Sequence, residues 1–406
     1  MALTVRRSRG IVVEYGDETI IFDPSSNSPY ENIFVSHAHA DHAAAFRFPQ
    51  KRKYSTEETL NLVKPSETIT PGEWAPIAPG GRVKIEDIEV RAHNAGHILG
   101  SLQYEVVTPE GNLLYTGDFS YVDTYTMRAA EVVPCDLLVV ETTFGSPVFT
   151  FPPREKIAID IVQWSIKEVV EKGKIPAFQT DSIGNAQELI TIFNRMTRLP
   201  VVTTPAVTRA NRTYEKYRYK LDYIDAGSEE GAELLSSGGC ILIASKGSNL
   251  SRYENLETAF ASGWALLLKH GERMPFPLSD HADFRQLLSF IRRCAPKRVF
   301  TFHGGRYSQE FANFVKHRLG IEADNLTEQV ENLRGRLSPE TARVDACCRK
   351  ILEMVRIPGF EYTKRWLIRE MARKSFSKAE VDQALKRLMD QGPLTQPQDS
   401  DKIKLG

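Results

Sequence analysis

The stretch FVSHAHADHAAAF (residues 34–46) places three of the chain's nine histidines within six positions. They are His37, His39 and His42, with Asp41 beside them, and an apolar, strand-like segment comes directly before. Because alternate residues of an extended segment point the same way, His37 and His39 converge on one point. Asp41 and His42 follow where a helix could begin, and they can face a second point nearby. We therefore expect a fold in which strand ends meet at one rim and complete a polar site there.

The chemistry of these side chains indicates a metal. Imidazole and carboxylate groups without a thiolate are typical ligands for Zn²⁺ or a similar first-row ion. The alternative is a surface loop that happens to be rich in histidine. The order H-x-H-x-D-H directly after an apolar strand favours the metal site over that alternative.

Further ligand candidates lie at other predicted strand ends. His97 is flanked by glycines in NAGHILGS, Asp118 ends LLYTGD, and His303 ends VFTFHGG. Asp23 ends TIIFD and is better placed to hold a ligand histidine in position. A structural role explains each residue alone equally well. Together they supply two sets of about four ligands that share Asp118, which predicts a two-metal site.

The acidic residues support the same prediction. Without metal, each close pair among the side chains of Asp41, Asp118 and Glu141 would repel by about 4 kcal/mol at an effective dielectric near 20. Divalent cations offset this repulsion, and a purely structural scaffold has no reason to accept it.

Composition limits the class of protein. The 406 residues are 41% hydrophobic and 26% charged, which is typical of a globular protein with two or three domains. Because 52 basic and 52 acidic residues cancel, no overall positive field attracts nucleic acid. Five scattered cysteines without C-x-x-C spacing favour a reducing, cytoplasmic location. No apolar run is long enough for export or membrane insertion, so no membrane partner is expected.

The periodicity of apolar residues changes along the chain. Residues 1–145 read as short strands and hairpins, and RVKIEDIEVRAHNAGH (residues 82–97) reads as an alternating strand that breaks at Gly96. From about residue 152, helical segments alternate with apolar strands, which predicts a parallel sheet covered by helices. The helix PPREKIAIDIVQWSIKEVVEKG has proline near its start and Gly173 after its end.

Residues 338–406 read as a separate unit. A first helix begins at Ser338, a second spans about residues 362–372, and a third has a capping box of Ser377 and Glu380. A small hairpin follows, so we expect a winged helix-turn-helix. The unit holds 14 Lys and Arg against 10 Asp and Glu, a net charge of +4. This charge favours nucleic acid, with a protein partner or self-association as alternatives.

These motifs resemble the metallo-β-lactamase superfamily and, within it, the β-CASP branch of nucleic-acid-processing enzymes. Glu141 in VVETTFG, His281 in LSDHADF and His303 correspond to residues that distinguish this branch. The resemblance covers about residues 8–325. It implies an α/β protein: an αββα metallo-β-lactamase sandwich with an inserted α/β β-CASP domain and the C-terminal winged helix-turn-helix. The implied domains are residues 1–145 with 281–337 (metallo-β-lactamase), 146–280 (β-CASP) and 338–406 (winged-helix-like).

The resemblance also implies a site. It implies two Zn²⁺ ions, with Mn²⁺ or Fe²⁺ as alternatives, held by His37, His39, Asp41, His42, His97, Asp118 and His303. Asp41 also counts among the catalytic residues, His281 would act as general acid, and Glu141 would orient it and favour its protonated form. Glycine-containing turns suited to phosphate contacts supply substrate-binding candidates, namely Ser245, Lys246, Gly247, Ser279, Gly304 and Arg306.

The implied function is a metal-dependent nuclease. ASGW (residues 261–264), LSDHADF and FHGG are most similar to ligase-associated DNA exonucleases, which favours a 5′→3′ DNA exonuclease on single strands or ends, in repair or replication. A β-CASP ribonuclease in RNA processing or decay is the alternative, and His303 is a residue found more often in RNA-acting members. Two further alternatives are a thioester hydrolase on the same metal fold and a non-catalytic binding module.

Overall fold

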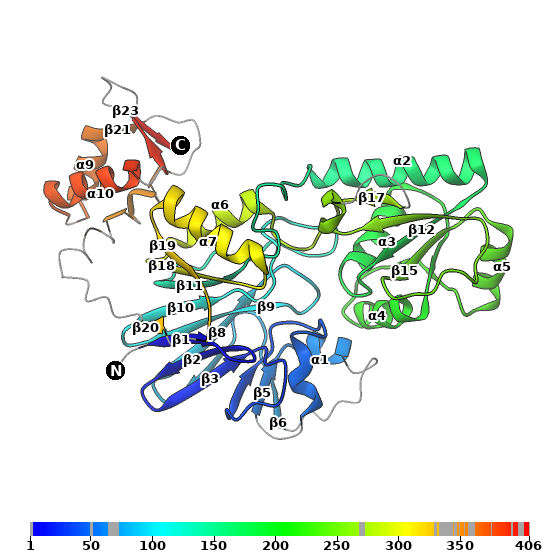
Figure 1. Cartoon of the computed structure of the whole chain (residues 1–406), viewed down its shortest axis with the longest axis horizontal. Helices are drawn as coiled ribbons and strands as arrows, with labels where there is room; N and C mark the ends of the chain where they lie inside the picture. The colour runs from blue at the N-terminus through cyan, green and yellow to red at the C-terminus, as the bar shows by residue number, and fades with distance from the viewer. Residues whose placement is uncertain are drawn as a thin grey trace.

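The computed structural model contains three main sheets and a small C-terminal unit (Figure 1). Two sheets are stacked on each other, and the third lies beside them in the inserted segment. The residues described are 3–48, 52–63, 73–267, 273–328, 331–332, 344, 347–348, 350–352, 354–355, 362–374, 376–390, 393–396 and 402–405.

The first sheet contains a hairpin that turns at Gly16 and Asp17, with Tyr15 paired to Glu18 beside the turn and Ile11 paired to Phe22 at the open end. It has seven strands, which follow here in spatial order. They are β20 (Glu331–Asn332), β1 (Thr4–Arg7), β2 (Ile11–Tyr15), β3 (Glu18–Phe22), β4 (Asn32–Phe34), β5 (Arg52–Ser55) and β6 (Glu73–Pro76).

The second sheet also has seven strands. Four candidate site residues lie at or just after strand ends of this sheet, namely His97, Asp118, Glu141 and His303. In spatial order the strands are β19 (Glu322–Asn325), β18 (Arg298–Phe302), β11 (Leu137–Glu141), β10 (Gly111–Tyr115), β9 (Leu102–Thr108), β8 (Ile88–Asn94) and β7 (Arg82–Ile85).

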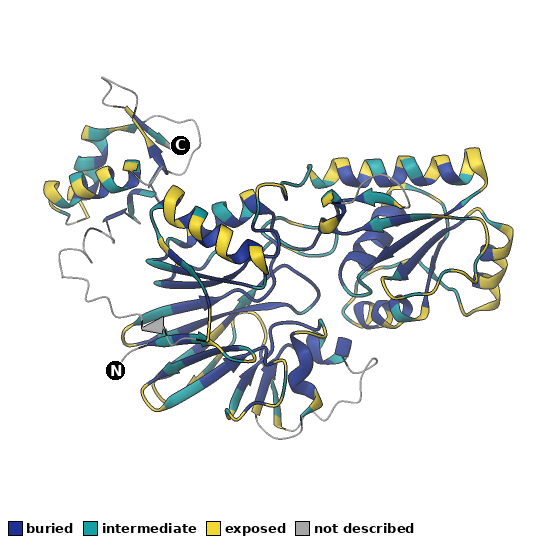
Figure 2. Ribbon diagram, in the orientation of Figure 1, coloured by how far each residue is buried: buried dark blue, intermediate teal, exposed yellow. Residues whose placement is uncertain are grey.

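The two sheets pack face to face over an aromatic core. Phe22 and Phe34 of the first sheet contact Tyr104 and Tyr115 of the second, with ring centroids 4.9–5.5 Å apart for three of these pairs. Alternate residues of each strand face this layer, and Figure 2 shows both sheets as largely buried. The stacking fixes the two sheet rims relative to each other.

Helices cover both outer faces. The helices α6 (Phe284–Cys294) and α7 (Arg306–Leu319) pack on the second sheet, and α1 (Glu57–Val63) and the 3-10 helix η1 (Ala43–Arg47) pack on the first. The result is the αββα sandwich that the sequence implied.

The inserted segment contains a parallel sheet of six strands with helices on both faces. The helix expected after residue 152 is α2, and Gly173 ends it in the left-handed conformation (φ 63°). The elements of this segment are α2 (Arg154–Lys172), β12 (Ile175–Thr180), α3 (Asn185–Met196), β13 (Val201–Thr203), α4 (Pro205–Lys216), β14 (Ile224–Asp225), α5 (Glu229–Ser237), β15 (Ile241–Ser245), β16 (Leu256–Ala261), η2 (Gly263–Leu267) and β17 (Met274–Phe276).

The described residues of the C-terminal unit include the helices α9 and α10 and a three-stranded antiparallel sheet. The capping box forms as expected, because the side chains of Ser377 and Glu380 each accept a hydrogen bond from the other residue's backbone N–H. The expected start at Ser338 lies outside the described residues, and the assignment as a winged helix-turn-helix stays a prediction. The elements are β21 (Tyr362–Thr363), α9 (Lys364–Ala372), α10 (Lys378–Asp390), β22 (Leu394–Thr395) and β23 (Lys402–Leu405).

One strand prediction is wrong. Residues 82–94 form the hairpin β7–β8, with Ile85 paired to Ile88 across a turn at Glu86. Glu86 has a positive φ of 45°, which reverses the chain within two residues. In addition, β4 ends at Phe34, so two loop residues separate the strand from His37.

Among the described residues, no helix is both long and apolar enough to cross a membrane.

Candidate active site

The site lies where the ends of several strands meet. His37 follows β4, His97 follows β8, Asp118 follows β10, and His303 follows β18. Glu141 is the last residue of β11, which pairs in parallel with β18. Because these strands end at one rim of the sandwich, side chains far apart in the sequence come within contact distance.

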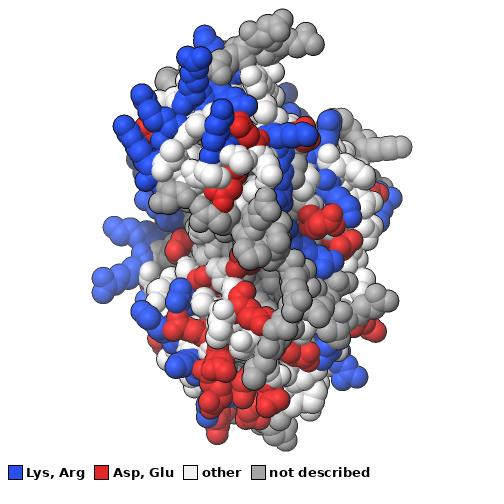
Figure 3. All heavy atoms as spheres, turned by 90° about the vertical axis from the view of Figure 1, so that its left-hand side faces the viewer, with Lys and Arg blue, Asp and Glu red and all other residues white. Residues whose placement is uncertain are grey.

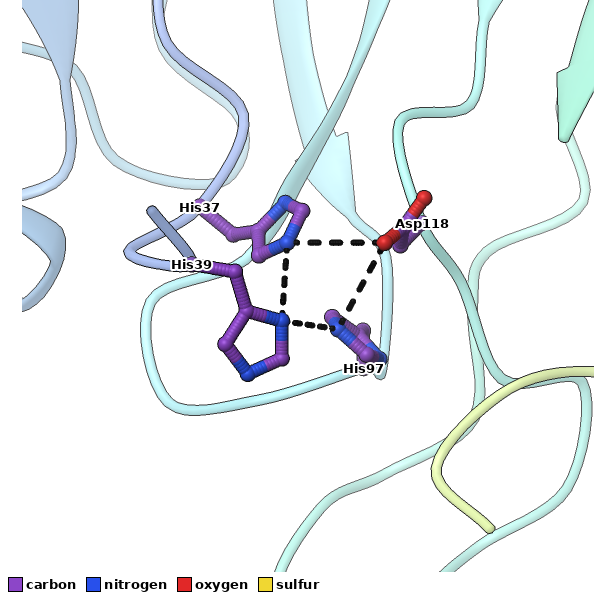
Figure 4. Close-up of side chains that lie close together, drawn as sticks. All are labelled: His37, His39, His97 and Asp118. Carbon is purple, nitrogen blue, oxygen red and sulfur yellow. Dashed lines mark hydrogen bonds and ion pairs between the residues drawn. The ribbon is translucent and has the colours of Figure 1, made fainter. Parts of the chain in front are cut away.

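Four of the predicted ligands form a first cluster. Nδ1 of His39 lies 3.1 Å from Nε2 of His37 and 3.1 Å from Nε2 of His97. Oδ2 of Asp118 lies 3.6 and 3.9 Å from the same two nitrogens. Figure 4 shows the four side chains pointing toward one another, His37 and His39 from one loop and His97 and Asp118 from two others. Four ligands about 2.05 Å from one ion in tetrahedral geometry lie about 3.4 Å apart, so this spacing fits a zinc-sized ion.

The other three ligand candidates form a second cluster beside the first. Oδ2 of Asp41 lies 3.7 Å from Nε2 of His42 and 3.5 Å from Nε2 of His303. The same Nε2 of His42 lies 3.5 Å from Oδ2 of Asp118. Asp118 therefore lies between the two clusters, where the sequence predicted a shared ligand.

Asp23 holds two of the histidines from behind. Its Oδ2 lies 2.8 Å from Nδ1 of His42 and accepts hydrogen bonds from the hydroxyls of Ser36 (2.5 Å) and Tyr115 (2.7 Å). Because the Ser36 hydroxyl donates to Asp23, it accepts from Nδ1 of His37 at 2.9 Å. Both imidazoles therefore carry a proton on Nδ1 and direct Nε2 toward the clusters.

Two backbone carbonyls orient the remaining histidines of the first cluster. The carbonyl of Asp280 lies 3.0 Å from Nδ1 of His97, and that of Ile183 lies 3.2 Å from Nε2 of His39. Since a carbonyl can only accept, these nitrogens are protonated and the opposite ones are bare. The three bare nitrogens of His37, His39 and His97 then face one another, an arrangement that a cation stabilises.

Burial sets the ionisation of the cluster. The pKa values of His37 and His97 lie well below the usual range, chiefly because both rings are buried. Burial also disfavours the charged forms of His42 and Asp118, but their mutual attraction prevails. It raises the pKa of His42 to about 10, with help from Asp23, and holds the pKa of Asp118 well below its usual range. Positive charge beside the buried Asp118 carboxylate therefore stabilises its ionised form.

Unpaired buried atoms point to the same requirement. Nε2 of His42 and Oδ1 of Asp118 are buried and make no hydrogen bond within the described part of the chain. Leaving such atoms unsatisfied is costly, and coordination of a cation removes that cost. Imidazoles and carboxylates without a thiolate fit Zn²⁺, Mn²⁺ or Fe²⁺. The residues present therefore fit the metal that the sequence implied.

A histidine–carboxylate pair lies next to the first cluster. Nδ1 of His281 is 2.9 Å from Oε1 of Glu141, and the two rings of His281 and His97 have centroids 4.6 Å apart. Burial opposes the charged imidazole, but the Glu141 carboxylate raises the pKa of His281 to about 10. The pair is arranged to keep His281 protonated at neutral pH.

The loop that carries His281 is tied to the inserted segment. Arg154 of α2 donates to both carboxylate oxygens of Glu188 (2.6 Å each) and also to the carbonyl of Ser279. The Ser279 hydroxyl in turn accepts from the backbone N–H of His281 at 3.1 Å. Glu188 is 1% exposed, so this ion pair lies in an environment where breaking it is costly.

Backbone conformation near the site requires particular residues. Gly96 has a φ of 68°, and a Cβ there would lie 2.5 Å from the carbonyl oxygen of Arg128. The close approach expected from the glycines around His97 is therefore present. Asp23 and His303 also have positive φ values, 46° and 61°, which cost energy in residues with a side chain.

The substrate-binding candidates have varied surroundings. Lys246 pairs with Asp181 at 2.7 Å, and the space where a Cβ of Gly247 would lie is open. The Gly304 N–H donates to Ser308, and the Arg306 guanidinium lies over the Tyr307 ring, 4.8 Å from its centroid. Ser245 and Ser279 both have bonded hydroxyls, to Ser248 and to the His281 N–H. Substrate contact stays a prediction for all six.

Sequence reasoning missed several residues that support the site. Asp280 stands next to His281 in the SDHAD segment, and Tyr115 stands in the YTGD segment, so both lay within stretches already singled out. Ile183 and Arg154 gave no signal, because one acts through its backbone carbonyl and the other through contacts with distant elements.

Comparison with known families matches two parts of the chain. Residues 20–170 match the β-lactamase superfamily domain, and residues 270–325 match the RNA specificity domain of Zn-dependent metallo-hydrolases. The first contains six of the seven ligand candidates, and the second contains His281 and His303.

Similar proteins carry names that refer to DNA ligation, RNA cleavage and transcription termination. The chain is 32% identical over 311 residues to a probable DNA ligase of Opitutus terrae, covering 73% of this chain and 28% of that protein. It is 25% identical over 403 residues to RNase aCSPSF2 of Saccharolobus solfataricus, covering 79% of this chain and 80% of that protein. It is also 30% identical over 164 residues to transcription termination factor FttA of Methanothermobacter thermautotrophicus, covering 39% and 24%.

A solved structure shares the fold. A protein of unknown function from Enterococcus faecalis superimposes with a TM-score of 0.52 at 17% identity, covering 74% of this chain and 94% of that one. The αββα sandwich, the two matched domains and the similar proteins together assign the chain to a family. The chain belongs to the metallo-β-lactamase superfamily and, within it, to the β-CASP branch.

Proposed function

We propose that the chain is a metal-dependent nuclease that hydrolyses phosphodiester bonds of nucleic acid. The observation that carries the proposal is the pair of ligand clusters sharing Asp118, with the Glu141–His281 pair directly beside them. The chain spans 28% of the first relative's length, so the activity of the whole relative is not transferred with it.

The first cluster and the second cluster would each hold one divalent ion. When bound, such ions supply positive charge for the phosphate oxygens and lower the pKa of water, so that hydrolysis proceeds at neutral pH. We assign His37, His39, His97 and Asp118 to the first ion, and Asp41, His42, His303 and Asp118 to the second. Asp23 fixes two of these imidazoles in the required tautomer.

His281 would donate a proton to the departing oxygen. The leaving group of a phosphodiester is an alkoxide, which is poor unless it is protonated as the bond breaks. Glu141 keeps the ring oriented through Nδ1, so the proton on Nε2 is the one available for transfer. The Oδ1 of Asp280 lies 3.9 Å from that Nε2, and its charge also favours the protonated form of His281.

We propose DNA as the substrate, cleaved as an exonuclease in the 5′→3′ direction during repair or replication. The support is the similarity to a probable DNA ligase over 73% of this chain. The experiment compares matched 5′-phosphorylated single strands of DNA and RNA, with zinc or manganese supplied. Faster hydrolysis of RNA would overturn the choice of DNA and leave the nuclease proposal in place.

A ribonuclease is the second candidate. It is favoured by the match of residues 270–325 to an RNA specificity domain and by the RNase that aligns over 79% of this chain. The two candidates share one site and one chemistry, so only the substrate comparison separates them. Hydrolysis of a thioester with none of either nucleic acid would contradict both.

A further inference from the structure

We infer that helix α9 presents a binding surface for the phosphate backbone of nucleic acid, separate from the candidate active site. This surface, the α9 arginine row, consists of Arg365, Arg369 and Arg373. The inference rests on the proposed function only for the class of ligand, because a nuclease acts on a long polyanion that extends beyond its reaction site.

The three arginines lie in one line. They are four residues apart, and Arg373, the C-cap residue of α9, keeps helical backbone angles (φ −62°, ψ −20°). The three therefore share one face, about 6 Å from one to the next along the axis. All three are exposed, while Leu367 and Met371 on the opposite face are fully buried in the core of the C-terminal unit. Packing of the apolar face therefore directs the row to solvent.

The basic charge of the unit is concentrated in α9 and the two residues that follow it. Residues 364–374 contain five Lys and Arg and one Glu, a net charge of +4. Residues 338–406 contain 14 and 10, also +4, so the remainder has nine of each and is neutral. Local concentration, rather than the modest total, is what attracts a polyanion.

Two of the three guanidinium groups can pair with a ligand without first breaking an ion pair. Within the described part of the chain, no acidic side chain forms an ion pair with Arg365 or Arg369, whereas Arg373 contacts Glu370 at 2.6 Å. Lys364 is occupied differently, because it bridges to Asp382 of α10 at 2.9 Å and so ties the two helices together.

The surroundings favour a polyanion over an apolar partner. Figure 3 shows Lys and Arg side chains gathered over the C-terminal unit at the top of that view, and acidic ones gathered at the bottom. Trp366 stands beside the row on the same helix and is partly exposed, with its ring 5.5 Å from that of Tyr362. A guanidinium row with an adjoining aromatic ring is typical of nucleic-acid surfaces.

The position of α9 predicts which substrates can contact the α9 arginine row. In Figure 1 the C-terminal unit lies beside α6 and α7, on the side of the sandwich away from the inserted segment. A short oligonucleotide bound in the site would not reach α9, whereas a long one would contact both. The row should therefore lower the KM for long substrates and leave short ones unaffected.

The test variant changes Arg365, Arg369 and Arg373 to Gln together in the full chain. A matched control changes three exposed lysines of α2 to Gln, namely Lys156, Lys167 and Lys172. Binding to a fluorescent duplex of about 30 base pairs and to a single strand of the same length is measured against salt, in a His281→Ala background that slows cleavage. Cleavage of short and long substrates is measured with His281 intact.

The expected result is a fall of about 2 to 3 in the slope of log K against log salt for the α9 variant, since each lost phosphate contact removes about 0.9. The KM for the long substrate should rise about tenfold, with the short substrate unchanged. An unchanged slope, or an equal fall in the α2 control, would overturn the inference. Failure of every form to cleave the short substrate would instead contradict the proposed function.

Discussion

Nδ1 of His281 lies 2.9 Å from Oε1 of Glu141, although 140 positions separate the two residues along the chain. Glu141 is fully buried, and its Oε2 accepts a hydrogen bond from the backbone N–H of Thr143 at 2.8 Å. The carboxylate is therefore held from both sides and in turn holds the imidazole. Such a pair orients a proton donor and stabilises its charged form.

Replacement of His281 by Ala should reduce kcat by about 10²–10⁴ on a natural phosphodiester, the usual contribution of a general acid. A substrate with a p-nitrophenolate leaving group needs no proton, so the same variant should hydrolyse it at nearly the original rate. Steady-state kinetics on the two substrates measures the difference. Equal losses on both would show that His281 does not act as the acid.

The Glu141→Gln substitution tests the charge in the pair. Burial opposes the charged imidazole and the carboxylate favours it, raising the pKa of His281 to about 10. An acid must be protonated to act, so activity falls as pH rises through this pKa. Without the carboxylate charge the pKa drops, and the alkaline limb of kcat/KM should move to lower pH. A pH profile with an unmoved alkaline limb would argue against this coupling.

Asp23 should control metal affinity without touching the metal. Asp23→Asn weakens the acceptor that serves His42 directly and His37 through Ser36, so zinc affinity should fall by about 10- to 100-fold. Competition with a chromophoric chelator measures it. Tyr115→Phe is the control, because it removes a single hydrogen bond to the same carboxylate and should have a smaller effect.

Metal removal should destabilise the fold as well as abolish activity. An ion that binds only the folded chain adds about 2.7 kcal/mol at 100 times its Kd, so the melting temperature should rise with free zinc. In Asp118→Ala the ligand shared by both clusters is lost, and that dependence should largely disappear. A zinc-dependent shift that survives in this variant would rule out Asp118 as a shared ligand.

Gly96→Ala should lower stability through the backbone. The residue has a φ of 68°, and the added methyl would meet the Arg128 carbonyl oxygen at 2.5 Å. We expect a loss of about 1–3 kcal/mol, measured by urea denaturation. Gly247→Ala is the matched control, since open space surrounds its Cβ, and it should change stability by less than about 0.5 kcal/mol.

Local pattern accounts for much of the fold. The helical spacing, the early proline and Gly173 predicted α2, and Ser377 with Glu380 predicted the start of α10. The hairpin β7–β8 was missed, although its signal was present: Ile85 and Ile88 are three apart and break the period of two. A tight turn between two alternating strands is easily read as one longer strand.

The sequence by itself determined the chemistry of the site, because residue types and their place after apolar strands are local properties. It supplied every ligand candidate, Glu141, His281 and the expectation that Asp23 stands behind them. Only the tertiary structure decided the contacts that orient those groups, such as the Ile183 carbonyl on His39 and the Arg154 guanidinium on the Ser279 carbonyl. A backbone carbonyl carries no residue-specific pattern, and its partner is chosen by how the inserted sheet packs against the sandwich.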